Sequence, residues 1–266
     1  MLLPHALTSK LLSEAGFRHA FFTRTGGVSR GPFESLNFSA SVGDDPTHVH
    51  ENFERAGQFL HLPNESLCHL NQVHGRGVVQ LAEQAVRSAT ATLDGDALIS
   101  ECASVACAVR TADCVPILVA DVESGAVAAI HAGWRGIVAG VVESALQNLK
   151  RLTVNGGQLV AAVGPHISLA AFEISDDVAQ ALESASSANG VVDRISFPKP
   201  HADLRKIVHA QLATNGVTEI DDVLGCTLLE PDRFFSFRRS GVRSGRHLSA
   251  IVARGHREGL LFAPVG

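Results

Sequence analysis

Short apolar runs in the middle of the chain predict strands that are buried on both faces. Polar residues or glycine separate these runs, which cover residues 97–99, 105–109, 115–120 and 126–130. Because they lack the alternation of a half-buried strand, such runs are typical of strands covered on both sides. A similar run at 159–163 predicts a further strand that ends at Gly164-Pro165.

Apolar residues at helical spacing predict amphipathic helices around these strands. The strongest pattern covers 137–149, a second covers 47–60, and weaker ones cover about 175–187 and 202–214. Strands and helices mixed without strict alternation favour a mixed-sheet α/β (α+β-like) sandwich with helices packed on the sheet. The chain has no repeat and no long linker, so we expect one domain over residues 1–266.

Composition and charge narrow the class of protein. The chain has 266 residues, of which 45% are hydrophobic, and a formal net charge of −5. The negative net charge argues against general binding to nucleic acid or to an anionic membrane. The sequence shows neither an apolar run of the ~20 residues that span a bilayer nor a secretion signal, so we expect a cytoplasmic protein. Five cysteines in so long a chain do not indicate a disulfide framework.

Candidate chemistry gathers in three segments. His131-Ala132-Gly133-Trp134-Arg135-Gly136 closes a predicted strand and contains the only Trp of the chain. Cys114 directly precedes another predicted strand, and His74 follows Asn71-Gln72-Val73 in an earlier loop. If the strands at 115–120 and 126–130 pair as a hairpin, the side chains of Cys114 and His131 reach the same end of the sheet.

One thiol and two imidazoles form a sensible ligand set for Zn²⁺. Thiolate and imidazole suit this ion, and three protein ligands leave a fourth position for water or substrate. The separations between His74, Cys114 and His131 along the chain are too long for a zinc finger or ribbon. On spacing alone, an alternative stays open in which Cys114 is a small buried hydrophobe and both histidines are hydrogen-bonded loop residues.

A second group of residues could bind anions. Arg24 is close to Gly26-Gly27, whose backbone amides could form an anion nest, and Arg135 lies near a predicted helix N-terminus. Arg238 and then Gly245-Arg246 follow a run of phenylalanines. The alternative is that these arginines are solvated surface charges and that the phenylalanines pack in the core.

At these positions the chain resembles the YfiH-like family, long labelled a multicopper polyphenol oxidase or laccase domain. The motifs that carry the resemblance extend over nearly the whole chain: Thr23-Arg24-Thr25-Gly26-Gly27-Val28-Ser29, Leu36-Asn37, Gln72-Val73-His74-Gly75, Ala112-Asp113-Cys114-Val115-Pro116, His131–Gly136, Gly164-Pro165-His166-Ile167, Phe172-Glu173 and Phe235-Ser236-Phe237-Arg238-Arg239. The family often has Tyr where Phe237 stands, and this chain contains no Tyr.

The resemblance implies an α/β domain with Zn²⁺ held by His74, Cys114 and His131. It also implies phosphorolysis of adenosine, inosine, guanosine and S-methyl-5′-thioadenosine, together with deamination of adenosine. The expected partners are therefore purine nucleosides and phosphate, and nothing in the sequence predicts an oligomeric state. The older label implies copper-dependent oxidation of phenols. A third label, peptidoglycan editing factor, implies hydrolysis of a cell-wall precursor that carries a wrongly incorporated serine.

Physical arguments disfavour the copper alternative. A multicopper oxidase needs several copper centres with many His ligands at short spacings. The chain has one His-x-His pair, at His48-Val49-His50, and one Cys/His₂ set cannot serve several metals. An open Zn²⁺ position suits hydrolytic deamination, because the ion activates water.

The resemblance also suggests roles for residues beside the metal ligands. Arg24, Arg135 and Arg238 could clamp phosphate through their forked guanidinium groups, and we assign Asn37 to the same binding site. We also expect Arg24 and Arg135 to take part in catalysis. Asp113, next to Cys114, is expected to be a carboxylate behind a metal ligand or a proton carrier in catalysis. Its alternative is a structural turn residue before the strand.

A structural zinc scaffold that binds a partner protein remains a further alternative. It predicts a closed site with four protein ligands. By residue type, the candidates for the fourth ligand are Cys107, Cys102 and His69.

Overall fold

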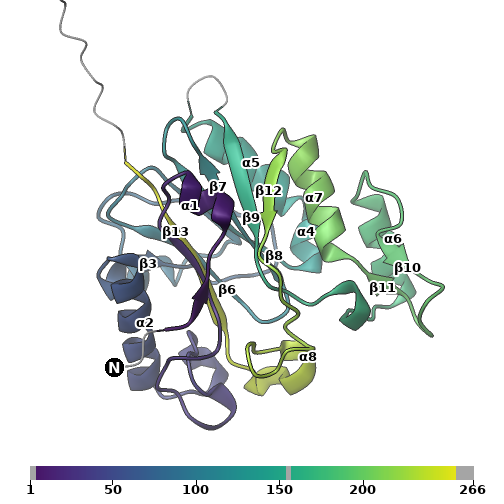
Figure 1. Ribbon diagram of the computed structural model, residues 1–266, viewed down its shortest axis with the longest axis horizontal. Helices are drawn as coiled ribbons and strands as arrows, with labels where there is room; N and C mark the ends of the chain where they lie inside the picture. The colour runs from purple at the N-terminus through teal and green to yellow at the C-terminus, as the bar shows by residue number, and fades with distance from the viewer. Residues whose placement is uncertain (1–3, 154–156, 256–266) are drawn as a thin grey trace, which may run out of the picture.

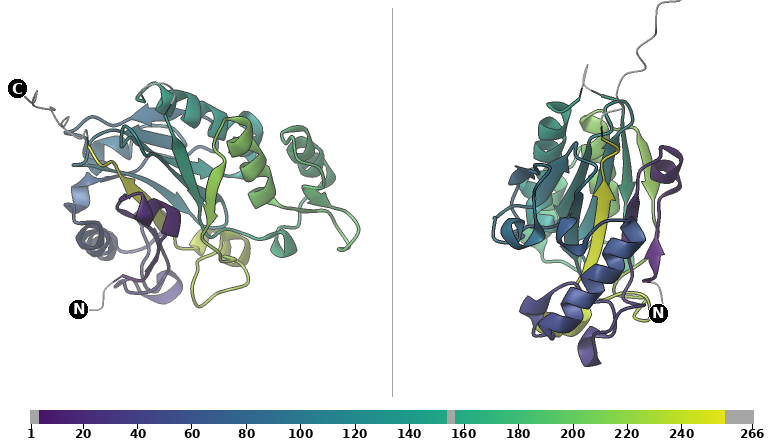
Figure 2. Two further views of the ribbon diagram at one scale, coloured as in Figure 1. Left: turned by 45° about the horizontal axis from the view of Figure 1, so that its top comes forward. Right: turned by 90° about the vertical axis from the view of Figure 1, so that its left-hand side faces the viewer.

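Two β-sheets packed face to face form the centre of the molecule (Figures 1 and 2). The computed structural model describes residues 4–153 and 157–255. Within these residues the first sheet has five strands, in the order β1 (Ala6–Leu7), β2 (His19–Phe22), β13 (His247–Val252), β6 (Ala106–Thr111) and β3 (Leu67–Cys68). All neighbours in it are antiparallel except β3 and β6.

The second sheet carries most of the strands that the sequence predicts. In the described part of the chain it has six strands, in the order β12 (Glu219–Asp222), β9 (Leu159–Val163), β7 (Val115–Asp121), β8 (Val127–Ala132), β5 (Ala97–Ser100) and β4 (Val78–Gln80). The β12–β9 and β4–β5 pairs are parallel and the others antiparallel, so the sheet is mixed. A short ribbon of β10 (Val192–Asp193) and β11 (His201–Ala202) lies apart from both sheets in the pairing order.

Helices cover the outer face of each sheet (Figure 1). Helix α2 (Pro46–Leu60) packs on the five-stranded sheet, and α5 (Val141–Lys150) and α7 (Leu204–Thr214) pack on the six-stranded sheet. The other α-helices in the described residues are α1 (Lys10–Glu14), α3 (Arg87–Thr90), α4 (Trp134–Ala139), α6 (Asp176–Ser184) and α8 (Phe237–Ser240). Short 3₁₀ turns occur at Gly31–Phe33, Ala40–Val42, Asn64–Ser66, Leu169–Ala171 and Gly241–Arg243.

Strand β7 shows why the central runs are apolar at every position. Ile117 and Val119 point into the core between the second sheet and its helices, whereas Leu118 and Ala120 point into the core between the two sheets. All four side chains are fully buried. Successive side chains of a strand face opposite sides, so a strand in an inner layer needs apolar residues on both.

The structure confirms the predicted fold class: an α/β sandwich built on mixed sheets with helices packed on their outer faces. The five predicted strands and the helix at 47–60 are present, with ends shifted by one or two residues. The weaker patterns at about 175–187 and 202–214 correspond to helices α6 and α7, which are shorter than expected. No helix in residues 4–153 and 157–255 is long and apolar enough to cross a membrane.

The prediction of one helix over 137–149 is wrong. Helix α4 already begins at Trp134 and ends at Ala139, Gly140 caps it, and α5 begins at Val141. Gly140 has a φ of 83°, in the left-handed region that glycine adopts without strain. The apolar periodicity continues across this break and therefore hides it. The early start of α4 places Trp134 and Arg135 in its first turn.

We expect the core between the sheets to carry much of the stability. Replacing fully buried Leu118 with alanine should lower the free energy of unfolding by about 2–5 kcal/mol, because it removes apolar contacts and leaves a cavity. Leu229→Ala is the matched control, since Leu229 is 59% exposed. Urea denaturation measures both variants, and equal stabilities would contradict the assignment of Leu118 to a packed inner layer.

Candidate metal centre

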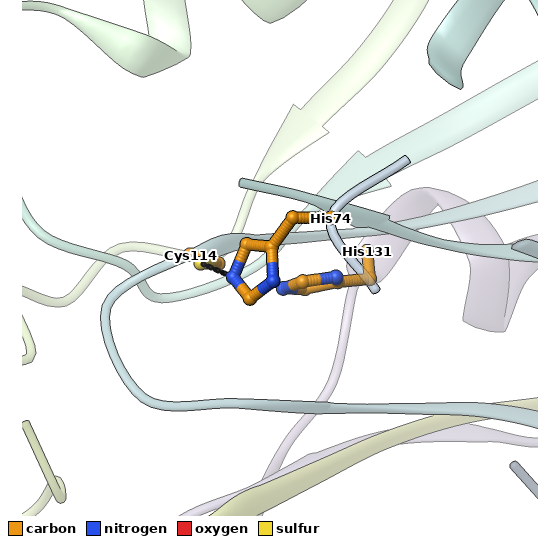
Figure 3. Close-up of side chains that lie close together, drawn as sticks. All are labelled: His74, Cys114 and His131. Atoms are coloured by element: carbon orange, nitrogen blue, oxygen red, sulfur yellow. Dashed lines mark hydrogen bonds between the residues drawn. The ribbon is translucent and has the colours of Figure 1, made fainter. Parts of the chain in front are cut away.

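His74, Cys114 and His131 converge at one end of the six-stranded sheet, where their side chains point toward one another (Figure 3). Strands β7 and β8 pair as an antiparallel hairpin, with Pro116 opposite His131, which confirms the expected pairing. Cys114 directly precedes β7, and His74 comes from the segment between β3 and β4.

The donor atoms of this set are close enough to share one metal ion. The thiol and imidazole donors all lie within 4.8 Å of one another, and Cys114 Sγ is 3.8 Å from His74 Nε2. A tetrahedral zinc site holds its sulfur and nitrogen ligands roughly 3.6 Å apart, given its usual bond lengths. The three residues therefore fit a metal ion without rearrangement of the backbone.

A buried carboxylate, Asp96, organises two of the ligands. It stands directly before β5 and is fully buried. Its Oδ1 accepts hydrogen bonds from His131 Nδ1 at 2.8 Å and from the backbone N–H of His74 at 3.0 Å. Its Oδ2 accepts one from the N–H of Gly75 at 2.6 Å. With Nδ1 bonded to Asp96, His131 has Nε2 left for a metal.

The same hydrogen bonds keep Asp96 ionised. Burial alone would raise the pKa of its carboxyl group, but the bonds from His131, Gly75 and His74 outweigh burial and lower the pKa below its usual value. An ionised Asp96 makes the His131 ring a better ligand, because it accepts the Nδ1 proton and fixes the tautomer.

The protein also tunes Cys114 toward its metal-binding form. Burial would raise the pKa of the thiol, but the charge of His131 and hydrogen bonds from His131 and His74 lower it to about 6. Burial would lower the pKa of His131, but Cys114 and Asp96 raise it to about 9. The thiolate is the form that would ligate a metal, and binding would displace the proton of His131.

Backbone geometry makes room for the ligands. His74 has a φ of 58°, and Asp96 holds its N–H in that left-handed conformation. At Gly133, an added Cβ would lie 2.8 Å from His74 Cδ2 and 3.0 Å from Cys114 Sγ. Only glycine therefore allows β8 to turn into α4 beside the two ligands.

A cavity of about 490 Å³ opens onto all three ligands. His74 is exposed and Cys114 half-buried, so the cavity side of the cluster is accessible to small molecules. Four arginines line the cavity, against the single carboxylate of Asp113 among its described lining residues: Arg110, Arg135, Arg238 and Arg246. This strongly cationic surface lies in a protein whose net charge is −5.

The structure brings two of the predicted arginines to the cavity. The guanidinium group of Arg135 is exposed and stacks over the Trp134 ring, with its carbon 4.4 Å from the ring centre. Arg238 donates to the carbonyl of Glu173 at 2.9 Å and lies over the ring of Phe172.

Arg24 does not line the cavity. Its Nε donates to the carbonyl of Glu34 at 2.8 Å, and its Nη1 donates to the carbonyl of Pro231 at 2.8 Å. The N–H of Gly27, expected in an anion nest, instead donates to Ser35 Oγ at 3.1 Å. Arg24 thus connects two loops by hydrogen bonds, and we do not include it in the site.

Asn37 and Asp113 act through other residues. Asn37 is fully buried behind the cavity wall, and its Oδ1 accepts from the N–H of Arg246 at 2.8 Å. Asp113 accepts from Thr227 Oγ1 and from the N–H of Arg238, both at 2.6 Å. The carboxylate behind a metal ligand, one of the roles expected for Asp113, is provided by Asp96.

The expected candidates for a fourth protein ligand lie elsewhere. Within the described residues the cluster contains neither Cys102, Cys107 nor His69. Cys107 is buried in β6, and the ring of His69 stacks on Phe53 at 5.7 Å. The described cluster therefore has three candidate ligands, the number that leaves a fourth position free in an open metal site.

The residues expected from the sequence did not include Asp96 and Arg110, and Arg246 was named among the arginines without a role. Asp96 had a signal, because an acidic residue directly before a buried strand needs hydrogen-bonding partners. Arg110 is a charged residue at the end of an otherwise apolar strand. Neither signal by itself says which partner the fold brings to the residue.

Comparison with known proteins identifies the family of this chain. The sequence model of the family described as multi-copper polyphenol oxidoreductase laccase matches residues 18–254. The chain belongs to this family, whose members include the YfiH proteins.

Three members of this YfiH-like family show how far the similarity extends. The purine nucleoside phosphorylase PA4543 of Pseudomonas aeruginosa is 37% identical over 247 residues, covering 92% of this chain and 97% of that protein. The purine nucleoside phosphorylase YfiH of Escherichia coli is 37% identical over 229 residues, covering 86% and 90%. The crystal structure of Bacillus licheniformis YfiH superposes with a TM-score of 0.86 at 25% identity, covering 94% of this chain and 97% of that chain.

Asp96→Asn should weaken metal binding by roughly 10- to 100-fold, because the neutral amide no longer polarises His131. Competition with a chromophoric chelator measures the affinity of the folded variant. Asp121→Asn is the control, since Asp121 is also fully buried but lies at the far end of β7. Equal metal affinity in the Asp96 variant and the unaltered protein would contradict the role of Asp96.

Gly133→Ala should displace His74 and Cys114 and lower the metal content of the purified protein. Gly75→Ala is a matched control, because a Cβ at Gly75 would make only ordinary contacts at 3.6 Å. Elemental analysis compares the two variants. Full metal occupancy after Gly133→Ala would show that the ligands do not need this space.

Proposed function

We propose that this protein is a zinc-dependent purine nucleoside phosphorylase that also deaminates adenosine. Its substrates are adenosine, inosine, guanosine and S-methyl-5′-thioadenosine. The observation that carries the proposal is an open His/Cys/His ligand set facing a cavity lined by four arginines. The similarity to proteins named purine nucleoside phosphorylase supports it.

The donor set favours zinc over copper oxidase chemistry. One thiolate and two imidazoles suit Zn²⁺, whereas a multicopper oxidase requires several copper centres. Among residues 4–153 and 157–255, the potential metal cluster is the one formed by His74, Cys114 and His131. A bound zinc ion would supply a Lewis acid with one coordination position toward the cavity.

The cavity walls suit a purine nucleoside and phosphate. Trp134 and Phe172 offer flat aromatic surface against which a purine can stack, and Ile167 adds apolar surface beside them. The arginines supply forked donors for a phosphate dianion. In phosphorolysis a phosphate oxygen bonds to C1′ of the ribose while the C1′–N9 electron pair leaves with the purine, and the proton lost by hydrogenphosphate balances the one that the purine gains, so the site must hold both reactants together.

Deamination needs water at the purine in place of phosphate at the ribose. The exposed position of His74 leaves the ligand set accessible to water from the cavity. We further propose that the enzyme works in the cytoplasm on small molecules. The five cysteines are all free, in keeping with a reducing compartment, and Cys114 requires its free thiol to bind metal.

Cys114→Ala should reduce the zinc content from about one per chain to near zero and abolish both reactions, because the thiolate ligand is lost. Cys102→Ala is the matched control, since Cys102 is also a half-buried free cysteine but lies outside the cluster. Elemental analysis and incubation with adenosine, with and without phosphate, measure the outcome.

The products separate the two proposed reactions. Adenine and ribose 1-phosphate should form only with phosphate present, whereas inosine should form in both incubations. Several copper ions per chain would contradict the zinc assignment. Full activity in Cys114→Ala would remove the metal from the mechanism, and no conversion of any of the four nucleosides by the zinc-loaded protein would refute the proposed function.

A further inference from the structure

Two of the four cavity arginines lie side by side and are half-buried. Arg110 is in β6, and Arg246 directly precedes β13, the strand paired with β6. Thr111 and His247, their neighbours in sequence, are opposite each other in this pairing. Both arginines line the cavity that contains the metal ligands.

Neither of these guanidinium groups has an anionic partner. Arg110 Nη1 makes only long contacts, 3.5 Å to the carbonyl of Phe38 and 3.4 Å to Ser39 Oγ, and its buried Nε has no hydrogen-bond partner. Arg246 Nη1 donates to the carbonyls of Ser244 and Gly245, at 2.7 and 3.1 Å. In the described part of the chain no carboxylate oxygen lies within 4 Å of either group, whereas Arg55, Arg87 and Arg194 each have such a partner.

This arrangement is costly without a bound anion. Burial, followed by the charges of Arg246 and Arg87, lowers the pKa of Arg110 to about 10, so the group stays charged at neutral pH. A buried charge that lacks a counter-charge destabilises a protein unless something pairs with it. The acceptors that contact the two groups are neutral. Asp113 and Cys114 act on Arg246 only from a distance, without a hydrogen bond or ion pair among the described residues, so a bound anion would supply the direct counter-charge that the pair lacks.

Side-chain amides hold the backbone of both arginines. Gln72 accepts from the N–H of Arg110 and donates to its carbonyl, each at 2.8 Å. Asn37 Oδ1 accepts from the N–H of Arg246 at 2.8 Å. The hydroxyls of Ser39 and Ser41 are 2.9 Å apart, and both residues line the cavity beside the pair. The backbone that carries the two guanidinium groups is therefore held in place before a ligand binds, which lowers the entropic cost of binding.

Arg135 and Arg238 differ from this pair in burial. Both are exposed, so water solvates their charges. Their guanidinium groups lie over Trp134 and Phe172, the aromatic part of the wall. Water therefore stabilises these two charges without a bound anion.

We propose that Arg110 and Arg246, with the hydroxyls of Ser39 and Ser41, form the subsite for inorganic phosphate, and that the aromatic wall at Trp134 and Phe172 receives the purine. This inference rests on the proposed function and assigns its two substrates to different parts of one cavity. One phosphate oxygen, held by the arginine pair, bonds to C1′ of the ribose. The C1′–N9 electron pair leaves with the purine, and the purine gains the proton that hydrogenphosphate loses when it becomes the phosphate ester.

Phosphate binding to the zinc-loaded protein tests this assignment without any turnover. Isothermal titration with inorganic phosphate alone should show binding by the unaltered protein. Arg246→Gln should weaken it by about tenfold or more, because a hydrogen bond to a charged group is lost. Arg30→Gln, the matched control, should bind phosphate within about threefold of the unaltered protein, since Arg30 is exposed and does not line the cavity.

Kinetics then separates a phosphate contact from a structural role. Arg246→Gln should raise the KM for phosphate by about tenfold and leave the KM for adenosine within about threefold, because the purine contacts are untouched. Arg110→Lys is the second variant, since it keeps the buried charge but loses the fork and should also weaken phosphate binding.

Each outcome of these titrations decides the inference. Loss of phosphate binding in Arg135→Gln but not in Arg246→Gln would overturn it, and so would the absence of phosphate binding by the unaltered holoenzyme. If phosphate binds through Arg246 but no ribose 1-phosphate forms with any of the four nucleosides, the proposed function fails while the oxyanion subsite stands.

Discussion

The hydrogen bonds to the carboxylate of Asp96 are the constraint on which the site depends. One buried side chain binds His131 Nδ1 and the backbone amides of His74 and Gly75. These groups come from separate segments, the strand β8 and the loop before β4. Asp96 therefore links the orientation of one metal ligand to the backbone position of another, and it does so from a place that no solvent reaches.

The pairing of strands in the six-stranded sheet places Asp96 beside the candidate ligands. Asp96 precedes β5, β5 pairs with β8, and β8 pairs with β7, so three adjacent strands bring Asp96, His131 and Cys114 to one end of the sheet. The side chains of these three strands are buried on both faces of the sheet, which fixes the register of the strand pairing. The same end of the sheet faces Arg110 and Arg246 of the five-stranded sheet, so the candidate metal ligands and the two half-buried arginines share one cavity.

Much of the fold could be predicted from the sequence because inner strands leave a strong signal. The continuous apolar runs identified β5 to β9, and the hairpin placed Cys114 beside His131. The break at Gly140 was missed because periodicity continues across it. Asp96 and Arg110 were missed because their roles depend on partners far along the chain, and local patterns carry no information about such contacts. Family resemblance, rather than spacing, joined His74 to the ligand set.

The central claim is an open zinc site with one sulfur and two nitrogen ligands from the protein. X-ray absorption spectroscopy of the purified holoprotein tests it most directly, because it reports both the element and the atoms bound to it. The account predicts a zinc edge, one sulfur at about 2.3 Å and nitrogen or oxygen neighbours at about 2.0–2.1 Å. A copper edge, or zinc without a sulfur neighbour, would contradict it.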